Sequence, residues 1–167
     1  EFRRVLFRSF LGRRSADLLL AARTALGSEV GTTGEDLVFI PNSTTGVNVV
    51  AHSLPLAPGD DVLATNLEYG ACDAAWQQVC RRSNVHYRQV TIPLPFDADA
   101  FVDRVMSAVT PRTRLIFASH ITSTTALTLP VAALCAAARE RGILTLDRKS
   151  TRLNSSHEWI SRMPSSA

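Results

Sequence analysis

TRLIFASHITSTTALTLPVAALCAAARERGILTL, residues 113–146, is the stretch that decides the fold. Its first seven residues, TRLIFAS, form a largely apolar run that predicts a buried strand. A polar loop follows, and residues 130–142 then predict a helix, because they begin with a proline suited to a first turn and end at a glycine. Residues 143–146 (ILTL) predict a further strand. Strands and helices in alternation are typical of an α/β protein.

The same alternation continues on the amino-terminal side of this stretch. Three short runs predict strands: LVFI (37–40), buried and ended by Pro41, DDVLAT (60–65) and VHYRQV (85–90). Apolar residues at helical spacing predict helices at 15–27, 42–54, 71–83 and 97–109. Ser15 is expected to cap the first of these helices and Gly27 to end it. The third helix is expected to bury one face, made by Ala75, Trp76, Val79 and Cys80.

Composition restricts the class of protein. The chain has 167 residues, 46% hydrophobic and 20% charged, which suits one globular domain and excludes a disordered or collagen-like chain. No apolar run approaches the length that spans a bilayer. Cys72, Cys80 and Cys135 lie far apart without CxxC spacing, which excludes a zinc knuckle or a redox pair and suggests small core residues. A reduced, cytoplasmic setting is therefore expected.

The positive charge of the chain is concentrated at its two ends. The net charge is +3, but residues 1–9 contribute +2 and residues 147–167 contribute another +2, which leaves −1 for residues 10–146. On composition alone, a basic arm and tail would favour nucleic-acid binding.

Both ends also resemble translated sequencing adapters. EFRRVLFRS (1–9) and DRKSTRLNSSH (147–157) are each similar to one reading frame of a short-read library adapter, and residues 158–167 would continue the second. We therefore expect residues 1–9 and 147–167 to be adapter-derived and without stable structure, and residues 10–146 to be the native sequence.

Residues 42–46 (NSTTG) form a polar loop between a predicted strand and a predicted helix. Unpaired backbone N–H groups and the helix dipole make such a helix start an anion site. The hydroxyls of Ser43 and Thr44 could add hydrogen bonds to a phosphate, and Gly46 would permit close approach of the backbone. The alternative is that Ser43 or Thr44 only caps the helix. The loop is neither a P-loop nor a GxGxxG fingerprint.

Two further polar loops follow predicted strands. NLEYG (66–70) carries Tyr69, which could stack on a planar ring, and SHITSTTA (119–126) carries His120, Thr122 and Ser123. Taken singly, Tyr69 and His120 are more simply structural residues. Open α/β sheets bind ligands at the carboxyl ends of their strands, so the three loops are expected to converge on a ligand with a phosphate and a flat ring. A nucleotide would also qualify.

Four segments carry a resemblance to a known family: VFIPNSTTGVN (38–48), LAPGDDVLATNLEYGACDAAW (56–76), TRLIFASHITSTTALTLPV (113–131) and ARERGILTL (138–146). Together they resemble the class V aminotransferases, pyridoxal-phosphate-dependent enzymes, and within them the isopenicillin N epimerase-like branch. The resemblance implies part of the large domain of a fold-type I enzyme, a three-layer α/β/α structure with a mostly parallel sheet. It also implies a pyridoxal 5'-phosphate cofactor, an amino acid substrate and a homodimeric parent, with no nucleic-acid or membrane partner.

The resemblance also assigns roles to residues. Ser43 and Thr44 match the cofactor-phosphate position, and Tyr69 matches the residue that stacks on the pyridine ring. Ser123, with Thr122 beside it, matches a polar residue that faces the ring's phenolic oxygen and is asparagine in desulfurase-like relatives.

Two further residues of the family pattern are expected beyond Leu146: an aspartate for the pyridine nitrogen and the Schiff-base lysine. Asp147 falls one residue short of that aspartate, and Lys149 is the only lysine in the sequence; both belong to the adapter-like tail. The fragment is therefore expected to be inactive. Two alternatives remain, a cysteine desulfurase or selenocysteine lyase fragment and a nonenzymatic Rossmann-like module that binds a nucleotide or phosphate.

Overall fold

A computed structural model describes residues 12–148, which fall into two units. The described part of the first unit ends at Phe39, and that of the second runs from Ile40 to Arg148. Of the segments expected to lack stable structure, residues 1–9 and 149–167 lie outside the described residues, whereas Asp147 and Arg148 belong to a strand, so the expectation is wrong for these two. Among the residues described, no helix combines the length and apolarity needed to cross a membrane.

The first unit contains helix α2 (Ser15–Val30) and the short 3-10 helix η2 (Gly34–Asp36). The expected end at Gly27 is wrong, because α2 continues to Val30 and stops at Gly31, whose φ of 72° is left-handed. Gly27 serves another purpose: a Cβ there would lie 2.9 Å from the carbonyl oxygen of Thr32, so glycine lets the returning chain pack on the helix. The expected cap is also wrong, since Arg14 holds the N-cap position and makes no side-chain cap bond.

Residues 37–40 do not form the buried strand that their composition predicted. They are extended, but they pair with no strand in the described part of the chain, and Val38 is 75% exposed. Apolar and β-branched residues favour an extended, half-buried surface, yet a strand forms only where a neighbouring strand accepts its hydrogen bonds. This segment crosses the boundary between the two units, where the described residues supply no such neighbour.

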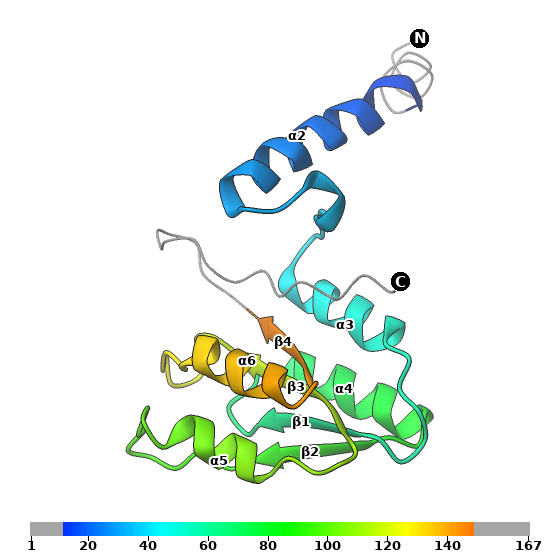
Figure 1. The fold of residues 1–167 in the computed structure, drawn as a ribbon. Helices are drawn as coiled ribbons and strands as arrows, with labels where there is room; N and C mark the ends of the chain where they lie inside the picture. The colour runs from blue at the N-terminus through cyan, green and yellow to red at the C-terminus, as the bar shows by residue number, and fades with distance from the viewer. Residues whose placement is uncertain (1–11, 149–167) are drawn as a thin grey trace. The chain divides into compact units, whose positions relative to one another are not determined.

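The second unit is built on a parallel sheet with strand order β2-β1-β3-β4 (Figure 1). The strands are β1 (Asp61–Thr65), β2 (His86–Val90), β3 (Thr113–Ser119) and β4 (Leu144–Arg148). The helices are α3 (Ser43–Ser53), α4 (Gly70–Arg82), α5 (Phe101–Ser107) and α6 (Val131–Glu140). These elements confirm the α/β alternation. Strand β4 extends two residues beyond the predicted end at Leu146, because Asp147 and Arg148 continue the pairing with Ala118 and Ser119.

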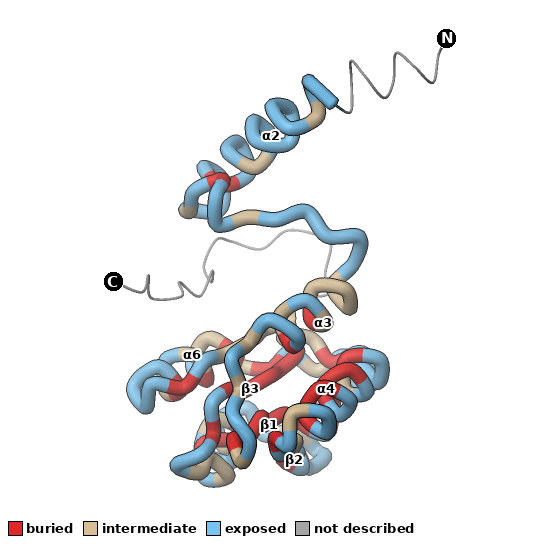
Figure 2. The backbone as a smooth tube through the Cα atoms, turned by 90° about the vertical axis from the view of Figure 1, so that its right-hand side faces the viewer, coloured by how far each residue is buried: buried red, intermediate tan, exposed pale blue. Residues whose placement is uncertain are grey.

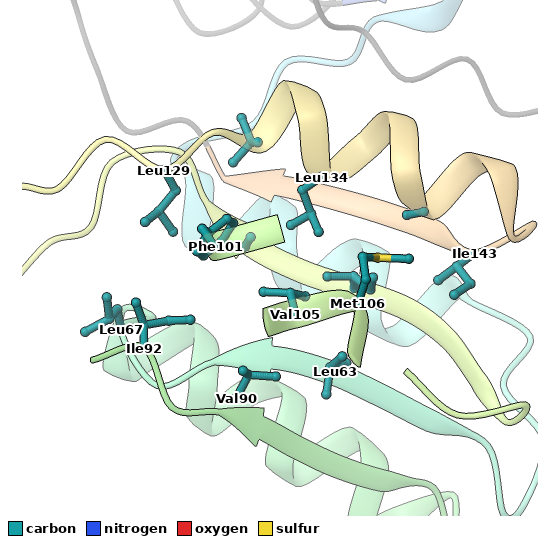
Figure 3. Close-up of a cluster of buried hydrophobic side chains, with 14 residues drawn as sticks. Leu63, Leu67, Val90, Ile92, Phe101, Val105, Met106, Leu129, Leu134 and Ile143 are labelled. Atoms are coloured by element: carbon teal, nitrogen blue, oxygen red, sulfur yellow. The ribbon is translucent and has the colours of Figure 1, made fainter. Parts of the chain in front are cut away.

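Helices cover both faces of the sheet, which confirms the three-layer architecture. On one face α3 and α4 enclose a core in which the Trp76 and Phe117 rings lie 6.1 Å apart, centroid to centroid. On the other face α5 and α6 enclose a second core that includes Phe101 and Leu134 (Figure 3). Neighbouring residues of β3 alternate between the two: Ile116 belongs to the second core and Phe117 to the first. Figure 2 shows β1 and β3 as the buried centre of this unit.

We expect Phe117→Ala to lower the free energy of unfolding by about 3–5 kcal/mol, because it leaves a cavity in the first core. Phe117 is fully buried against Trp76. Val49→Ala is a matched control, since Val49 is 53% exposed on α3 and should change stability by less than about 0.5 kcal/mol. Urea unfolding followed by Trp fluorescence measures both; equal effects would contradict the core assignment.

A buried carboxylate anchors the amino end of β1. Asp61 is 2% exposed; its Oδ1 lies 3.0 Å from His86 Nδ1, and its Oδ2 accepts from Thr110 at 2.6 Å. Burial by itself would raise the pKa of Asp61, but the hydrogen bonds from Thr110 and His86 outweigh it and hold the pKa below 3.8.

Stability should therefore fall on acidification through the Asp61 titration. A carboxyl whose pKa is lower in the folded chain contributes stability above its unfolded pKa of 3.8 and loses that contribution as the pH drops through the folded value. Asp61→Asn removes this titration, so its unfolding free energy should decline less steeply below pH 3.8 than that of the original chain. Urea unfolding across acidic pH gives both slopes, and parallel slopes would refute the assignment.

Candidate functional site

The candidate site lies at the carboxyl edge of the sheet. Strands β1 and β3 are parallel neighbours, so the loops that follow them, 66–69 and 120–130, leave the sheet side by side. In Figure 1 the arrowheads of the strands and the start of α3 lie at the same end of this unit. The three polar loops thus meet at one edge, although the first of them does not follow a strand.

The start of α3 is capped by Asn42. Its Oδ1 accepts hydrogen bonds from the Thr45 backbone N–H at 2.8 Å and from the Thr45 hydroxyl at 3.1 Å. The alternative in which Ser43 or Thr44 caps the helix is therefore wrong: asparagine, one residue earlier, already has its carbonyl oxygen in the cap position. Ser43 and Thr44 occupy the first turn and are half-buried. The cap of α3 therefore does not use the Ser43 or the Thr44 hydroxyl.

Thr44 lies beside the start of α4, where its hydroxyl acts against the rise in the pKa of the Cys72 thiol. Burial raises the pKa of Cys72, so this cysteine is an inert core thiol, as expected. Gly46 also has a packing role: a Cβ there would lie 2.6 Å from Ile40 Cδ1. What approaches Gly46 is thus an isoleucine side chain.

Tyr69 stands at the N-cap of α4 and is 41% exposed. One face of its ring is covered by the guanidinium of Arg148, whose Cζ lies 4.7 Å from the ring centroid. This is a cation–π contact. Sequence reasoning missed Arg148 because it lies 79 positions from Tyr69 in the numbering and was assigned to the adapter-like tail.

Glu68, next to Tyr69, is the charged residue buried at this edge and was also missed. It is 9% exposed and accepts hydrogen bonds from Thr65 and Ser119. Burial raises the pKa of Glu68, while those hydrogen bonds and the positive charge of Arg148 act in the opposite direction. An acidic residue three positions after a buried strand was the available signal.

The loop after β3 uses its polar groups mainly within itself. Thr122 is buried, its Oγ1 lies 2.7 Å from Thr125 Oγ1, and it accepts from the Leu127 backbone N–H at 2.9 Å. Ser123 is exposed, and His120 is half-buried with its backbone N–H donating to the Arg148 carbonyl. Arg148 therefore contacts both the Tyr69 ring and the 119–126 loop.

A family model described as Aminotransferase class-V matches residues 9–151. The chain belongs to the class V aminotransferase family. The resemblance seen in the four sequence segments is confirmed. The matched range covers all the elements described, including the three loops at the carboxyl edge of the sheet.

Two curated relatives show which activities occur among similar proteins. An isopenicillin N epimerase from Amycolatopsis lactamdurans is 39% identical over 141 residues, covering 82% of this chain and 35% of the epimerase. A cysteine desulfurase from Cronobacter sakazakii is 30% identical over 115 residues, covering 67% of this chain and 28% of the desulfurase. The chain thus spans about a third of the length of these relatives.

Solved structures share the fold. A C-DES mutant with glycine covalently linked to its PLP cofactor superposes with a TM-score of 0.72 at 23% identity, covering 86% of this chain and 40% of that one. The superposition shows that this chain shares the α/β fold of part of that structure.

Proposed function

We propose that this chain is part of the cofactor-binding domain of a pyridoxal-phosphate enzyme that acts on an amino acid, of the aminotransferase or epimerase type. The observation that carries the proposal is the convergence of the α3 start, Tyr69 and the 119–126 loop at one sheet edge in a class V chain. The epimerase relatives, at 39% and 40% identity, favour this type.

The residues at this edge fit the chemical parts of the cofactor. The start of α3, with the backbone N–H groups and hydroxyls of Ser43 and Thr44, suits a phosphate. The half-exposed ring of Tyr69 suits a flat pyridine, and Ser123 supplies an exposed hydroxyl after β3, next to Thr122, whose own hydroxyl bonds within the loop. Bound pyridoxal phosphate supplies an electron sink for charge that develops at the substrate's α-carbon.

Arg148 sets a condition on this fit. Its guanidinium already lies over one face of Tyr69, so a pyridine ring either takes the opposite face or displaces Arg148. The contact is worth about 0.5–1 kcal/mol at an exposed site, which an extended ring contact can replace.

Cysteine desulfurase or selenocysteine lyase is the second candidate function. The Cronobacter desulfurase, at 30% identity, favours it. A nonenzymatic module for a nucleotide or phosphate is a third reading, which the anion-binding start of α3 alone would support. The parent sequence beyond Leu146 discriminates between enzyme and binding module, because an aspartate followed by a lysine in a polar loop supports the enzymes. We further propose a cytoplasmic, homodimeric parent that has no nucleic-acid or membrane partner.

Thr44→Ala is expected to weaken pyridoxal phosphate binding by about ten- to a hundred-fold, the value of one hydrogen bond to a charged group, roughly 1.5–3 kcal/mol. Tyr69→Ala should weaken it by about five-fold through lost stacking, roughly 1 kcal/mol. Ser53→Ala is the control, because its hydroxyl lies at the opposite end of α3 and bonds the Val49 carbonyl. Equilibrium dialysis gives the dissociation constants. If both site variants match the control, the site assignment is wrong.

The 167-residue chain itself is expected to lack catalytic activity with added pyridoxal phosphate. The proposal places the Schiff-base lysine outside residues 10–146, which contain no lysine. Consumption of an amino acid, followed by chromatography, should equal that of free cofactor. Turnover above that background that persists in a Lys149→Ala variant would overturn this expectation.

A further inference from the structure

Glu68 makes three hydrogen bonds at the carboxyl edge of the sheet. Its Oε1 accepts from the Thr65 hydroxyl at 2.6 Å and from the Ser119 backbone N–H at 3.2 Å, and its Oε2 accepts from the Ser119 hydroxyl at 2.6 Å. Thr65 and Ser119 are themselves fully buried. A carboxylate in such surroundings is costly unless its oxygens are satisfied, and here both oxygens have donors.

These bonds continue the connection between β1 and β3 where the backbone pairing stops. The last paired residues of the two strands are Ala64 and Phe117. Thr65 and Ser119 are the final residues of their strands, and Glu68 connects them from outside the ladder. The carboxylate therefore joins two strand ends that pair with their outer neighbours, Thr65 with Val90 and Ser119 with Arg148, but not with each other.

Each of these strand ends leads directly into a part of the proposed cofactor site. Tyr69 follows Glu68 in the chain and is the N-cap residue of α4. A shift of the Glu68 backbone therefore also shifts Tyr69. Thr122 and Ser123 come three and four residues after Ser119. The spacing between the stacking ring and these hydroxyls thus depends on how β1 and β3 end.

We infer that Glu68 is a positioning residue, which holds the Tyr69 loop and the Thr122–Ser123 loop at a fixed distance through its bonds to Thr65 and Ser119. The inference rests on the proposed function for its consequence in cofactor binding, but the tie between the loops is a property of the chain alone. Glu68 acts through its neighbours and need not touch the cofactor.

Asp61 provides a matched comparison at the other end of β1. It is also a buried carboxylate with three partners, His86, Arg88 and Thr110, but it lies at the amino end of β1. Loss of Asp61 should therefore destabilise the sheet without loosening the two site loops. A purely structural role for Glu68 would make the Glu68 and Asp61 variants behave alike.

The test compares Glu68→Ala, Glu68→Gln and Asp61→Ala in the 167-residue chain by amide hydrogen exchange. Glu68→Ala should speed exchange about ten-fold or more in residues 66–70 and 119–127 relative to the centre of β3. Glu68→Gln should restore protection, because its amide oxygen can accept from Thr65 and from the Ser119 N–H while its NH2 donates to the Ser119 hydroxyl. Asp61→Ala should leave the difference between loops and β3 unchanged.

Pyridoxal phosphate binding, measured by equilibrium dialysis on the same proteins, is the second readout. Glu68→Ala should weaken binding about ten-fold, with Glu68→Gln and Asp61→Ala within about two-fold of the original chain. Uniform acceleration of exchange across the sheet in Glu68→Ala, or loops as protected as in the original chain, would overturn the inference. If the original chain binds pyridoxal phosphate, an unchanged affinity in Glu68→Ala would also overturn the inference.

Two other results of these experiments also decide between the proposals. If the original chain binds no pyridoxal phosphate, the proposed function fails for this chain and exchange alone decides the role of Glu68. If Glu68→Ala does not fold, Ser119→Ala takes its place, because it removes only the bond to Oε2. It should speed exchange selectively in residues 119–123, and no selective change would overturn the inference.

Discussion

The parallel pairing of β1 with β3 is the interaction on which the rest of the structure depends. Val62 pairs with Leu115 and Leu63 with Ile116, and successive side chains of both strands enter opposite cores. Because parallel neighbours need a crossover, helices must cover both faces, and both strands must end at the same edge. That edge is where Tyr69 and the 119–126 loop lie. The position of the candidate site is therefore a consequence of the same ladder that forms the core.

The two ends of β1 illustrate how one strand can bury two carboxylates with opposite electrostatic outcomes. At Asp61 the hydrogen bonds from Thr110 and His86 outweigh burial, so the pKa falls. At Glu68 burial outweighs the hydrogen bonds from Ser119 and Thr65, so the pKa rises. The partners contribute to the difference: Asp61 has the Arg88 guanidinium within 3.4 Å of its Oδ2, whereas the hydrogen-bond donors to Glu68 are neutral and the charge of Arg148 does not outweigh burial. The negative charge of a buried carboxylate is thus less well stabilised by its neighbours at the carboxyl edge of the sheet, at Glu68, than at the amino edge, at Asp61.

Sequence patterns correctly predicted those elements whose formation depends on residues that are close together in the sequence. The apolar run of β3 and the buried face of α4, with Trp76 and Cys80, were confirmed because a repeating period is a property of neighbouring residues. Prediction was wrong where the outcome depends on a distant part of the chain: residues 37–40 have the composition of a strand but pair with none in the part of the chain that the structure describes, and Gly27 proved to be a point of close packing. The convergence of the loops could be predicted from topology, but the Glu68–Ser119 tie, between residues 51 positions apart, could not. The roles of Ser43, Thr44, Tyr69, Thr122 and Ser123 toward a cofactor stay predictions.

The extension of β4 through Asp147 and Arg148 is compatible with an adapter origin for these residues, because a ladder pairs backbone groups and accepts almost any side chain. Ala118 and Ser119 offer backbone positions that any residues after Leu146 can pair with, so the strand continues. The side chain, by contrast, is specific to this sequence: an arginine at position 148 places a cation on Tyr69 and near Glu68. If residue 148 is adapter-derived, as we propose, the backbone of the site belongs to the family while the group covering its aromatic ring does not. The geometry of the α3 start and of Glu68 is then the part of this site that carries over to the parent enzyme, since neither depends on the side chain of residue 148.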